Sequence, residues 1–328
     1  MSRRHRAGRA AAELQPPTPE MFEPVRCYGC GAADAVPLAT ARDDFTGKPG
    51  RFSYVRCTRC GLGYQNPRLK LEHIAGYYDD DTVAERVEAG WRWLLPAYRW
   101  AVEGIERKRL AIVRRHLALD DGSAVLDVGC GAGRFLRVVR RTSGAAATGV
   151  DFKDRAAPSS PDGPEFRQGL FCEQDFAGRT FDLITMWHYL EHDYDPARSL
   201  ARARELLGPG GVLVVEVPRL DSLTRWLFRD RWPGLQAPQH LTLFTRASLL
   251  ALIRRAGFEV VEYRACGSLP AYFYFFTGVA FLWLGGRGLN LDRAILPYFV
   301  GQLLALPLRP LGRRLNLGIQ TVVCRPRA

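Results

Sequence analysis

The stretch Val125-Leu126-Asp127-Val128-Gly129-Cys130-Gly131-Ala132-Gly133-Arg134-Phe135-Leu136 carries the strongest fold signal in this chain. An apolar run ends at an acidic residue, three glycines follow at alternate positions, and a pattern of helical period continues after them. Glycines let the backbone turn tightly and let a flat polar ligand approach the main chain. We therefore predict a strand, a ligand-binding turn and a helix, in that order.

The pattern of this turn predicts the kind of ligand that it binds. It reads D-x-G-x-G-x-G rather than the G-x-G-x-x-G of dinucleotide-binding turns, so it does not indicate a pyrophosphate cradle. The carboxylate of Asp127 precedes the turn and suits a cationic amino group. A second apolar run ends at Asp151, where a carboxylate can accept hydrogen bonds from ribose hydroxyls. A ribose beside a charged, amino-acid-like end describes S-adenosylmethionine.

Two further segments extend the pattern: Phe181-Asp182-Leu183-Ile184-Thr185-Met186-Trp187-His188-Tyr189-Leu190-Glu191-His192 and Leu207-Gly208-Pro209-Gly210-Gly211-Val212-Leu213. With Asp195-Pro196, they resemble the fourth strand, its L-E-H-x-x-D-P extension and the turn before the fifth strand of class I S-adenosylmethionine-dependent methyltransferases. The resemblance covers roughly residues 110–263 and the last strand, at 318–324. It implies a Rossmann-like α/β sheet, mostly parallel with the last strand antiparallel, and methyl transfer from S-adenosylmethionine.

The resemblance also implies where the cofactor lies. Open parallel sheets bind their ligands beyond the carboxyl ends of the strands. The segment after the third strand, which contains Leu170, is assigned to the adenine by position only. The full set of predicted cofactor contacts is Asp127, Gly129, Cys130, Gly131, Gly133, Asp151, Phe152, Leu170, Trp187 and His188. Three prolines within residues 155–164 predict a loop in place of the usual helix between the second and third strands.

Three histidines are the candidate catalytic residues. Methyl transfer to oxygen or carbon needs a base as well as in-line approach. His240 is the predicted base, because Gln239-His240-Leu241-Thr242-Leu243-Phe244-Thr245 resembles the E-H-x-x-x-F-S/T element of zinc-containing sugar C-methyltransferases. Gln239 replaces their glutamate and cannot accept a proton, so an identical carbanion mechanism is not expected. His188 and His192 are the other candidates, and an alternative role for Glu191 and His192 is to cap the next helix.

Four cysteines near the N-terminus form two CxxC pairs: Cys27, Cys30, Cys57 and Cys60. Four thiolates suit tetrahedral Zn²⁺, and a site filled by protein ligands is structural rather than catalytic. A strand at residues 52–56 is expected to lead into the second pair. Disulfides are the rival interpretation and need an oxidising compartment. The N-terminal residues lack the apolar core of a secretory signal, which favours zinc and a cytoplasmic location.

Composition and patterning divide the chain into four parts. A basic tail (1–20) without apolar periodicity is expected to be disordered. A zinc ribbon (21–68) and a helical lid or linker (69–119) follow, with Tyr77 and Tyr78 as candidate lid residues; the methyltransferase core occupies 120–328. The net charge of +12 favours anionic partners, although a solvated arginine-rich surface explains it equally well.

An apolar insertion at 266–312 interrupts the end of the core. Residues 265–286 and 294–308 contain no charged side chain. A full membrane span is not expected, because the last strand must return to the same sheet. Three interpretations stay open: a helical hairpin in one leaflet, a lid over a lipid-like acceptor, or a dimer interface or extra core layer. In the first, headgroups on the inner face of the membrane would meet Arg287, Arg293, Arg309, Arg313 and Arg314.

These features favour a methyltransferase for a small-molecule, lipid-linked or glycan-linked acceptor. One alternative is an RNA methyltransferase with a zinc ribbon. The fourth strand, however, ends in Met-Trp-His rather than N/D-P-P-Y/F, and no basic, aromatic-interleaved strand predicts nucleic-acid binding. The other alternative is a non-catalytic scaffold on the membrane, which the intact acids and glycines of the turn disfavour. The acceptor atom and the oligomeric state stay open.

Overall fold

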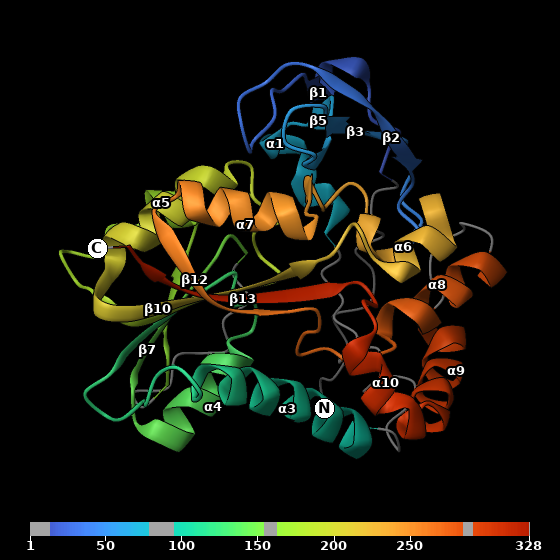
Figure 1. Cartoon of the computed structure of the whole chain (residues 1–328). Coiled ribbons are helices and arrows are strands. Elements are labelled where there is room, and N and C mark those ends of the chain that lie inside the picture. The colour runs from blue at the N-terminus through green and yellow to red at the C-terminus, as the bar shows by residue number, and fades with distance from the viewer. Residues whose placement is uncertain (1–13, 79–94, 154–162, 285–290, 328) are drawn as a thin grey trace, which may run out of the picture.

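A computed structural model of the chain describes residues 14–78, 95–153, 163–284 and 291–327 (Figure 1). Residues 1–13 of the predicted basic tail and residues 154–162 of the predicted proline-rich loop lie outside the described residues. The side chains of Arg287, Arg293, Arg309, Arg313 and Arg314 also lie outside them.

The core of the molecule is a seven-stranded sheet. Its strands follow the spatial order β12-β13-β10-β9-β6-β7-β8. Strand β13 is antiparallel to both of its neighbours, and the remaining pairs are parallel. This arrangement confirms the predicted Rossmann-like fold and its antiparallel last strand. The strands are β6 (Ala124–Val128), β7 (Ala146–Asp151), β8 (Glu165–Gln168), β9 (Phe181–Trp187), β10 (Leu207–Pro218), β12 (Phe258–Arg264) and β13 (Ile319–Pro326).

Helices cover both faces of this sheet (Figure 1). Alternate residues of a strand point to opposite faces, so Val125 and Leu126 of β6 enter two different apolar clusters. The cluster of Val125 includes side chains of α3 (Leu95–Val113) and α4 (Arg134–Ser143). The cluster of Leu126 includes side chains of α5 (Pro196–Leu206) and α7 (Arg246–Arg255). Since β6 is covered on both sides, its carboxyl end is the place where a ligand can approach it.

The N-terminal module forms a second sheet that reaches into the core. Its antiparallel strands follow the order β11-β4-β3-β2, with bounds β2 (Ala35–Ala41), β3 (Phe52–Cys57), β4 (Gly63–Gln65) and β11 (Thr242–Leu243). Strand β3 confirms the strand predicted at 52–56. Strand β11 lies within the predicted core (120–328), so the two parts of the chain share one sheet. A small pair, β1 (Phe22–Glu23) and β5 (Arg68–Leu69), lies beside them.

The predicted helical linker consists of α1 (Leu71–Ile74), a 3-10 turn (Ala75–Tyr77) and α3, with residues 79–94 outside the described part. Tyr77 is buried, and its hydroxyl donates to the carbonyl of Pro49. It therefore belongs to the ribbon core and is not a lid residue. The hydroxyl of Tyr78 lies 3.1 Å from Nδ1 of His192.

The apolar insertion between β12 and β13 is helical. Its helices are α8 (Phe273–Leu284), α9 (Leu291–Leu304) and α10 (Arg309–Arg314), and they gather with α6 (Leu223–Phe228) at one end of the sheet (Figure 1). Within the described residues, no helix has the length and apolar character needed to cross a membrane. The remaining 3-10 turns are Pro19–Met21, Phe171–Glu173, Arg229–Arg231, Pro233–Leu235 and Leu306–Leu308.

Candidate active site

The glycine turn lies at the carboxyl end of β6. Asp127 is buried, and its Oδ1 accepts a hydrogen bond from Oγ1 of Thr185 at 2.6 Å. Burial raises the pKa of Asp127 to about 7. Gly131 and Gly133 have φ values of +52° and +66°, which favour glycine. A Cβ at Gly133 would lie 2.4 Å from the ring of Phe166, whereas a Cβ at Gly131 would have no neighbour within 4 Å. The space beside Gly131 is therefore open to a ligand.

The neighbouring strand supplies a second carboxylate. Asp151 ends β7, and its Oδ2 accepts a hydrogen bond from the amide of Gly131 at 2.9 Å. Phe152 and Leu170 are 39% and 36% exposed, so apolar area is available for a flat base. Cys130 has a packing role, because its Sγ would lie 2.6 Å from a Cβ at Gly149. This donor set fits an adenosine with a cationic amino-acid end.

Trp187 is the last residue of β9. It is 5% exposed, and its ring packs against that of Phe135 at a centroid distance of 5.6 Å. The guanidinium of Arg109 lies 5.1 Å from its ring centroid. The indole Nε1 has no hydrogen-bond partner among the described residues. A buried N–H group without an acceptor destabilises the protein, so an oxygen atom of a ligand is a suitable partner for it.

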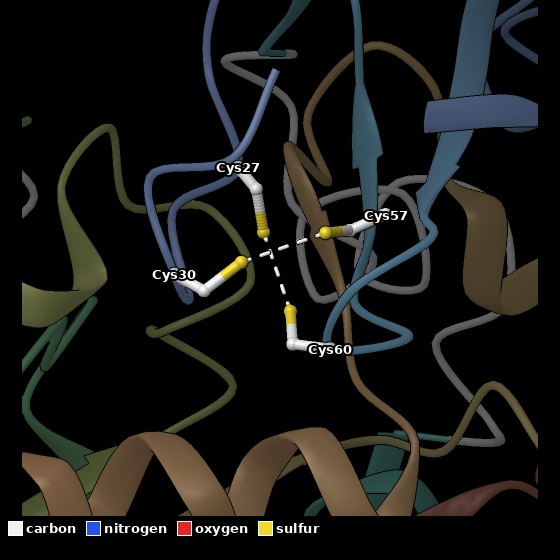
Figure 2. Close-up of side chains that lie close together, drawn as sticks. All are labelled: Cys27, Cys30, Cys57 and Cys60. Atoms are coloured by element: carbon white, nitrogen blue, oxygen red, sulfur yellow. Dashed lines mark hydrogen bonds between the residues drawn. The ribbon is translucent and has the colours of Figure 1, made fainter. Parts of the chain in front are cut away.

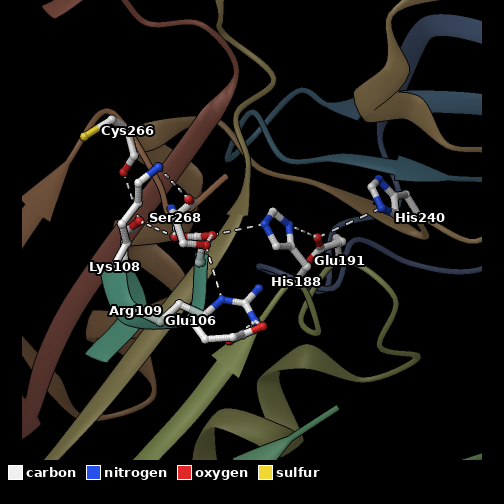
Figure 3. Close-up of polar contacts among 10 residues, drawn as sticks. Glu106, Lys108, Arg109, His188, Glu191, His240, Cys266 and Ser268 are labelled. Carbon is white, nitrogen blue, oxygen red and sulfur yellow. Dashed lines mark hydrogen bonds and ion pairs between the residues drawn. The ribbon is translucent and has the colours of Figure 1, made fainter. Parts of the chain in front are cut away.

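His188 bridges two buried carboxylates (Figure 3). Its φ of +54° lies in the left-handed region, which a non-glycine residue adopts only when its surroundings hold it there. Nδ1 lies 3.2 Å from Oε1 of Glu191, and Nε2 lies 3.1 Å from Oε1 of Glu216. Burial alone lowers the pKa of His188, but hydrogen bonds to the two carboxylates outweigh it and raise the pKa to about 9. With both ring nitrogens engaged, His188 holds the carboxylates in place.

Glu216 is a functional candidate that sequence reasoning missed. It is fully buried in β10, and its carboxylate also accepts hydrogen bonds from the amide of Ser268 and the hydroxyl of Thr321. Burial raises its pKa, but the hydrogen bond from His188 and its positive charge hold the pKa at about 2. The only signal in the sequence is an acidic residue inside the apolar run Val212-Leu213-Val214-Val215-Glu216-Val217.

Glu191, His192 and His240 form a cluster beside this bridge, in which Glu191 and His240 are buried and His192 is half-buried. Nε2 of His240 lies 4.0 Å from Oε1 of Glu191, and the rings of His192 and His240 meet edge to face with centroids 4.5 Å apart. Nδ1 of His240 donates to the carbonyl of Gly234 at 2.9 Å. Burial lowers the pKa of His240 to about 3, with His192 as a second cause, so its imidazole is neutral at physiological pH. The structure therefore brings the three predicted catalytic histidines together.

Helix capping is not the role of Glu191 or His192. The N-cap of α5 is Asp195, whose side chain accepts from the amide of Arg198. The main-chain carbonyl of Glu191 instead accepts from the amides of Leu241 and Thr242. Glu191 thus joins β11 to the end of β9.

Tyr78 links the cofactor residues to the histidine cluster. Its ring lies 5.0 Å from that of Phe152, and its hydroxyl lies 3.1 Å from Nδ1 of His192. The open turn and the cluster therefore face a common region, beyond the carboxyl ends of the strands.

The four ribbon cysteines converge on one point (Figure 2). Their sulfurs lie 3.4 Å apart for Cys27 and Cys60 and 3.5 Å apart for Cys30 and Cys57. A tetrahedron of sulfurs around Zn²⁺ has edges of about 3.8 Å, for Zn–S bonds of about 2.3 Å. No disulfide joins these cysteines, all of which are described. The donor set therefore fits a structural zinc ion.

The ribbon also contacts the segment that carries His240. The buried Tyr54 of β3 donates its hydroxyl hydrogen to the carbonyl of His240 at 2.9 Å. The amide of Gln65 in β4 donates to the carbonyl of Leu241, also at 2.9 Å. The cysteine module thus supports one wall of the candidate site.

Comparisons with known proteins find methyltransferases that are similar to this chain. The ubiquinone biosynthesis O-methyltransferase of Azorhizobium caulinodans is 29% identical over 217 residues, which cover 56% of this chain and 82% of that protein. A second such enzyme, from Cereibacter sphaeroides, is 29% identical over 156 residues, which cover 43% of this chain and 62% of that relative. Among solved structures, the 1,6-didemethyltoxoflavin-N1-methyltransferase of Burkholderia thailandensis, with bound S-adenosylhomocysteine, gives a TM-score of 0.46 at 18% identity over 83% of this chain and 98% of that one.

A family profile described as a methyltransferase domain matches residues 99–263, half of the 328-residue chain. The matched region contains the glycine turn, Asp151 and the His188 bridge. The chain therefore belongs to the methyltransferase domain family and is an S-adenosylmethionine-dependent class I methyltransferase.

Proposed function

We propose that the protein transfers a methyl group from S-adenosylmethionine to a ring hydroxyl of a small hydrophobic acceptor. The observation that carries this proposal is the Glu191–His192–His240 cluster, which Tyr78 connects to Phe152 at the cofactor turn. A hydroxyl acceptor must lose a proton, so it needs such polar side chains close to the methyl donor. The relatives named as ubiquinone biosynthesis O-methyltransferases support oxygen as the acceptor atom.

We propose that the cofactor residues divide their roles by chemistry. Asp127 faces the cofactor's amino group, and Asp151 faces the ribose. Phe152 and Leu170 flank the adenine, and Nε1 of Trp187 donates to an oxygen of the methionine part. The backbone at Gly129, Gly131 and Gly133 forms the floor. In this arrangement the sulfonium is aimed at the histidine cluster, and binding alone supplies much of the orientation.

Nε2 of His240 is proposed to face the acceptor hydroxyl. Nδ1 is engaged with Gly234, so Nε2 carries the lone pair. The role of His240 as general base stays a prediction, and its lowered pKa means that the imidazole alone holds a proton weakly. His188 is proposed as a positioning residue, because its ring joins Glu191 to Glu216.

The cysteine module is proposed to be a zinc ribbon of residues 21–68, followed by the linker 69–119 and the catalytic core 120–328. Cys27, Cys30, Cys57 and Cys60 would hold one Zn²⁺ and fix the turns that carry them. The ion would have a structural role, because protein ligands fill its coordination sphere.

The helical insertion is proposed to bring the chain to a lipid surface that holds the acceptor. Its outer side chains are exposed and apolar, with Trp283 at 85%, Leu304 at 73% and Leu303 at 65%, and Trp226 of α6 is 72% exposed. Exposed tryptophans suit a bilayer interface. Flotation with anionic vesicles tests this: a Trp283→Ser/Leu304→Ser variant should float less than the parent. A change of oligomeric state without flotation would instead indicate a dimer interface.

Methyl transfer is tested with tritium-labelled S-adenosylmethionine and catechols that carry alkyl tails of increasing length. Label should move into the organic phase, with a lower KM for longer tails. His240→Ala should lower kcat at least about a hundredfold and change cofactor affinity less than about twofold, as expected for a residue acting on the acceptor. His116→Ala is the matched control, because this histidine contacts Glu262 of β12 and lies outside the cluster. Label found only in added RNA would overturn the proposal.

A further inference from the structure

We propose that Glu191, His192 and His240 bind a divalent transition-metal cation, at a site separate from the cysteine cluster. One nitrogen or oxygen atom from each of these three side chains lies within 4.8 Å of the other two. The residues come from the segment after β9 and from the segment before β11, and hydrogen bonds to the main-chain carbonyl of Glu191 hold these two segments together.

Both imidazoles are oriented as metal ligands are. Nδ1 of His240 donates to the carbonyl of Gly234 at 2.9 Å, and Nδ1 of His192 donates to the carbonyl of Gln239 at 3.0 Å. A carbonyl can only accept, so each Nδ1 carries the hydrogen and each Nε2 carries a lone pair. Metal-binding histidines are held by such hydrogen bonds from their other ring nitrogen.

One carboxylate oxygen of Glu191 is available to bind a cation. Glu191 is fully buried, and Oε1 is engaged with Nδ1 of His188. Oε2 has no hydrogen-bond partner among the described residues. A buried carboxylate oxygen without a partner is strongly unfavourable, and a cation would supply the missing partner.

The donor set selects the kind of cation. Two imidazole nitrogens and one carboxylate suit Zn²⁺, Mn²⁺, Fe²⁺ or Co²⁺ rather than Ca²⁺ or Mg²⁺, which prefer oxygen ligands. Three protein ligands leave at least one coordination position open, as in catalytic rather than structural sites. That the open position takes the acceptor's hydroxyl oxygen rests on the proposed function. Coordination would lower the pKa of that hydroxyl, so in the metal-loaded protein Nε2 of His240 would serve as a metal ligand and not as the general base.

The experiment starts from the full chain with its cysteine cluster loaded with zinc. Equilibrium dialysis against Co²⁺, followed by metal analysis, should give one further equivalent of metal per chain. The visible spectrum should show cobalt bands without the sulfur-to-cobalt charge-transfer absorption that cysteine ligands produce. No additional equivalent in the parent protein, or a sulfur-ligated spectrum alone, would overturn the site.

Variants then locate the cation. Glu191→Gln and His240→Ala should each weaken Co²⁺ binding at least about tenfold, since each removes a ligand. His73→Ala, a histidine of α1 outside the cluster, should bind as the parent does. Affinity for S-adenosylhomocysteine, measured on the same samples, shows that each variant is folded. Unchanged Co²⁺ affinity in both ligand variants contradicts the assignment.

The same samples separate this inference from the proposed function. Label transfer from S-adenosylmethionine to the catechols is measured before and after the second metal is loaded. Cobalt binding at the cluster without label transfer would refute the proposed function and leave the site standing. Label transfer in protein that takes up no second metal would refute the site and leave the function standing.

Discussion

Asp127 links cofactor binding to pH in a way that can be measured directly. It is buried at the end of β6, and burial raises its pKa from 3.8 to about 7. If only the carboxylate binds the cationic amino group, the apparent Kd of S-adenosylmethionine depends on the ionised fraction. About nine tenths of the side chain is protonated at pH 6 and about one tenth at pH 8. The apparent Kd should therefore be roughly tenfold higher at pH 6 than at pH 8.

The same carboxyl group should affect stability with the opposite sign. A folded-state pKa above the unfolded value means that the folded protein binds more protons between pH 3.8 and 7. The contribution of Asp127 to stability is thus fully present below pH 3.8 and is lost as the pH rises through 7. At about 1.4 kcal/mol per pH unit, the ionised carboxylate destabilises the ligand-free protein at pH 8 by on the order of 4 kcal/mol.

Asp127→Asn tests both statements in one protein. It should remove the pH dependence of cofactor binding and weaken binding by at least about tenfold at pH 8. It should also raise the free energy of unfolding at pH 8 by about 1–3 kcal/mol, because the buried negative charge is removed. The gain is smaller than about 4 kcal/mol, because a buried amide that lacks one hydrogen-bond partner is itself destabilising. Calorimetric titration gives the Kd, and urea unfolding followed by tryptophan fluorescence gives the stability. Asp182→Asn is the control, because this aspartate lies near the start of β9 and its side chain accepts from the amide of Ala124. A variant that binds more weakly and is also less stable at pH 8 would refute the reasoning.

Three further expectations concern the other parts of the site. Asp151→Ala should raise the Kd of S-adenosylmethionine at least about tenfold in calorimetry, through the loss of ribose hydrogen bonds; an unchanged Kd contradicts that role. Cys57→Ser should lower the zinc content below one per chain and lower the Tm in scanning calorimetry, because three ligands hold Zn²⁺ less tightly; full zinc content argues against the cluster as its site. Tyr54→Phe should destabilise the fold by about 1 kcal/mol and lower kcat with little change in cofactor Kd, since it leaves the carbonyl of His240 without its donor; equal losses in kcat and cofactor binding would contradict a local effect.

Much of the fold could be predicted because its signals are local. The acid–glycine turn, the apolar run that ends at Asp151 and the strand at 318–324 each lie within a few consecutive residues. Strands β6, β7 and β13 confirm them. The cysteine spacing likewise predicted four sulfurs at one point, and the structure places them there.

The parts that could not be predicted depend on contacts between distant segments. Glu216 is 28 residues from His188 and 52 from Ser268, so no window of sequence shows their hydrogen bonds. Tyr77 follows the pattern of the linker but packs into the ribbon core, against Phe52. The capping role considered for Glu191 was wrong, because Asp195 directly precedes α5 and its side chain caps that helix.

Strand β11 connects the candidate active site to the cysteine module. Only one residue separates it from His240, yet it completes the sheet of the cysteine module through Thr242 and Tyr64. An oxidant or a competing chelator that disturbs the four thiolates would therefore also disturb the segment of His240, through the pairing of β4 with β11 and through the hydrogen bond from Tyr54. With Zn²⁺ bound to the four cysteines as proposed, the state of these thiolates would thereby affect catalysis, although the cysteine cluster lies outside the candidate active site.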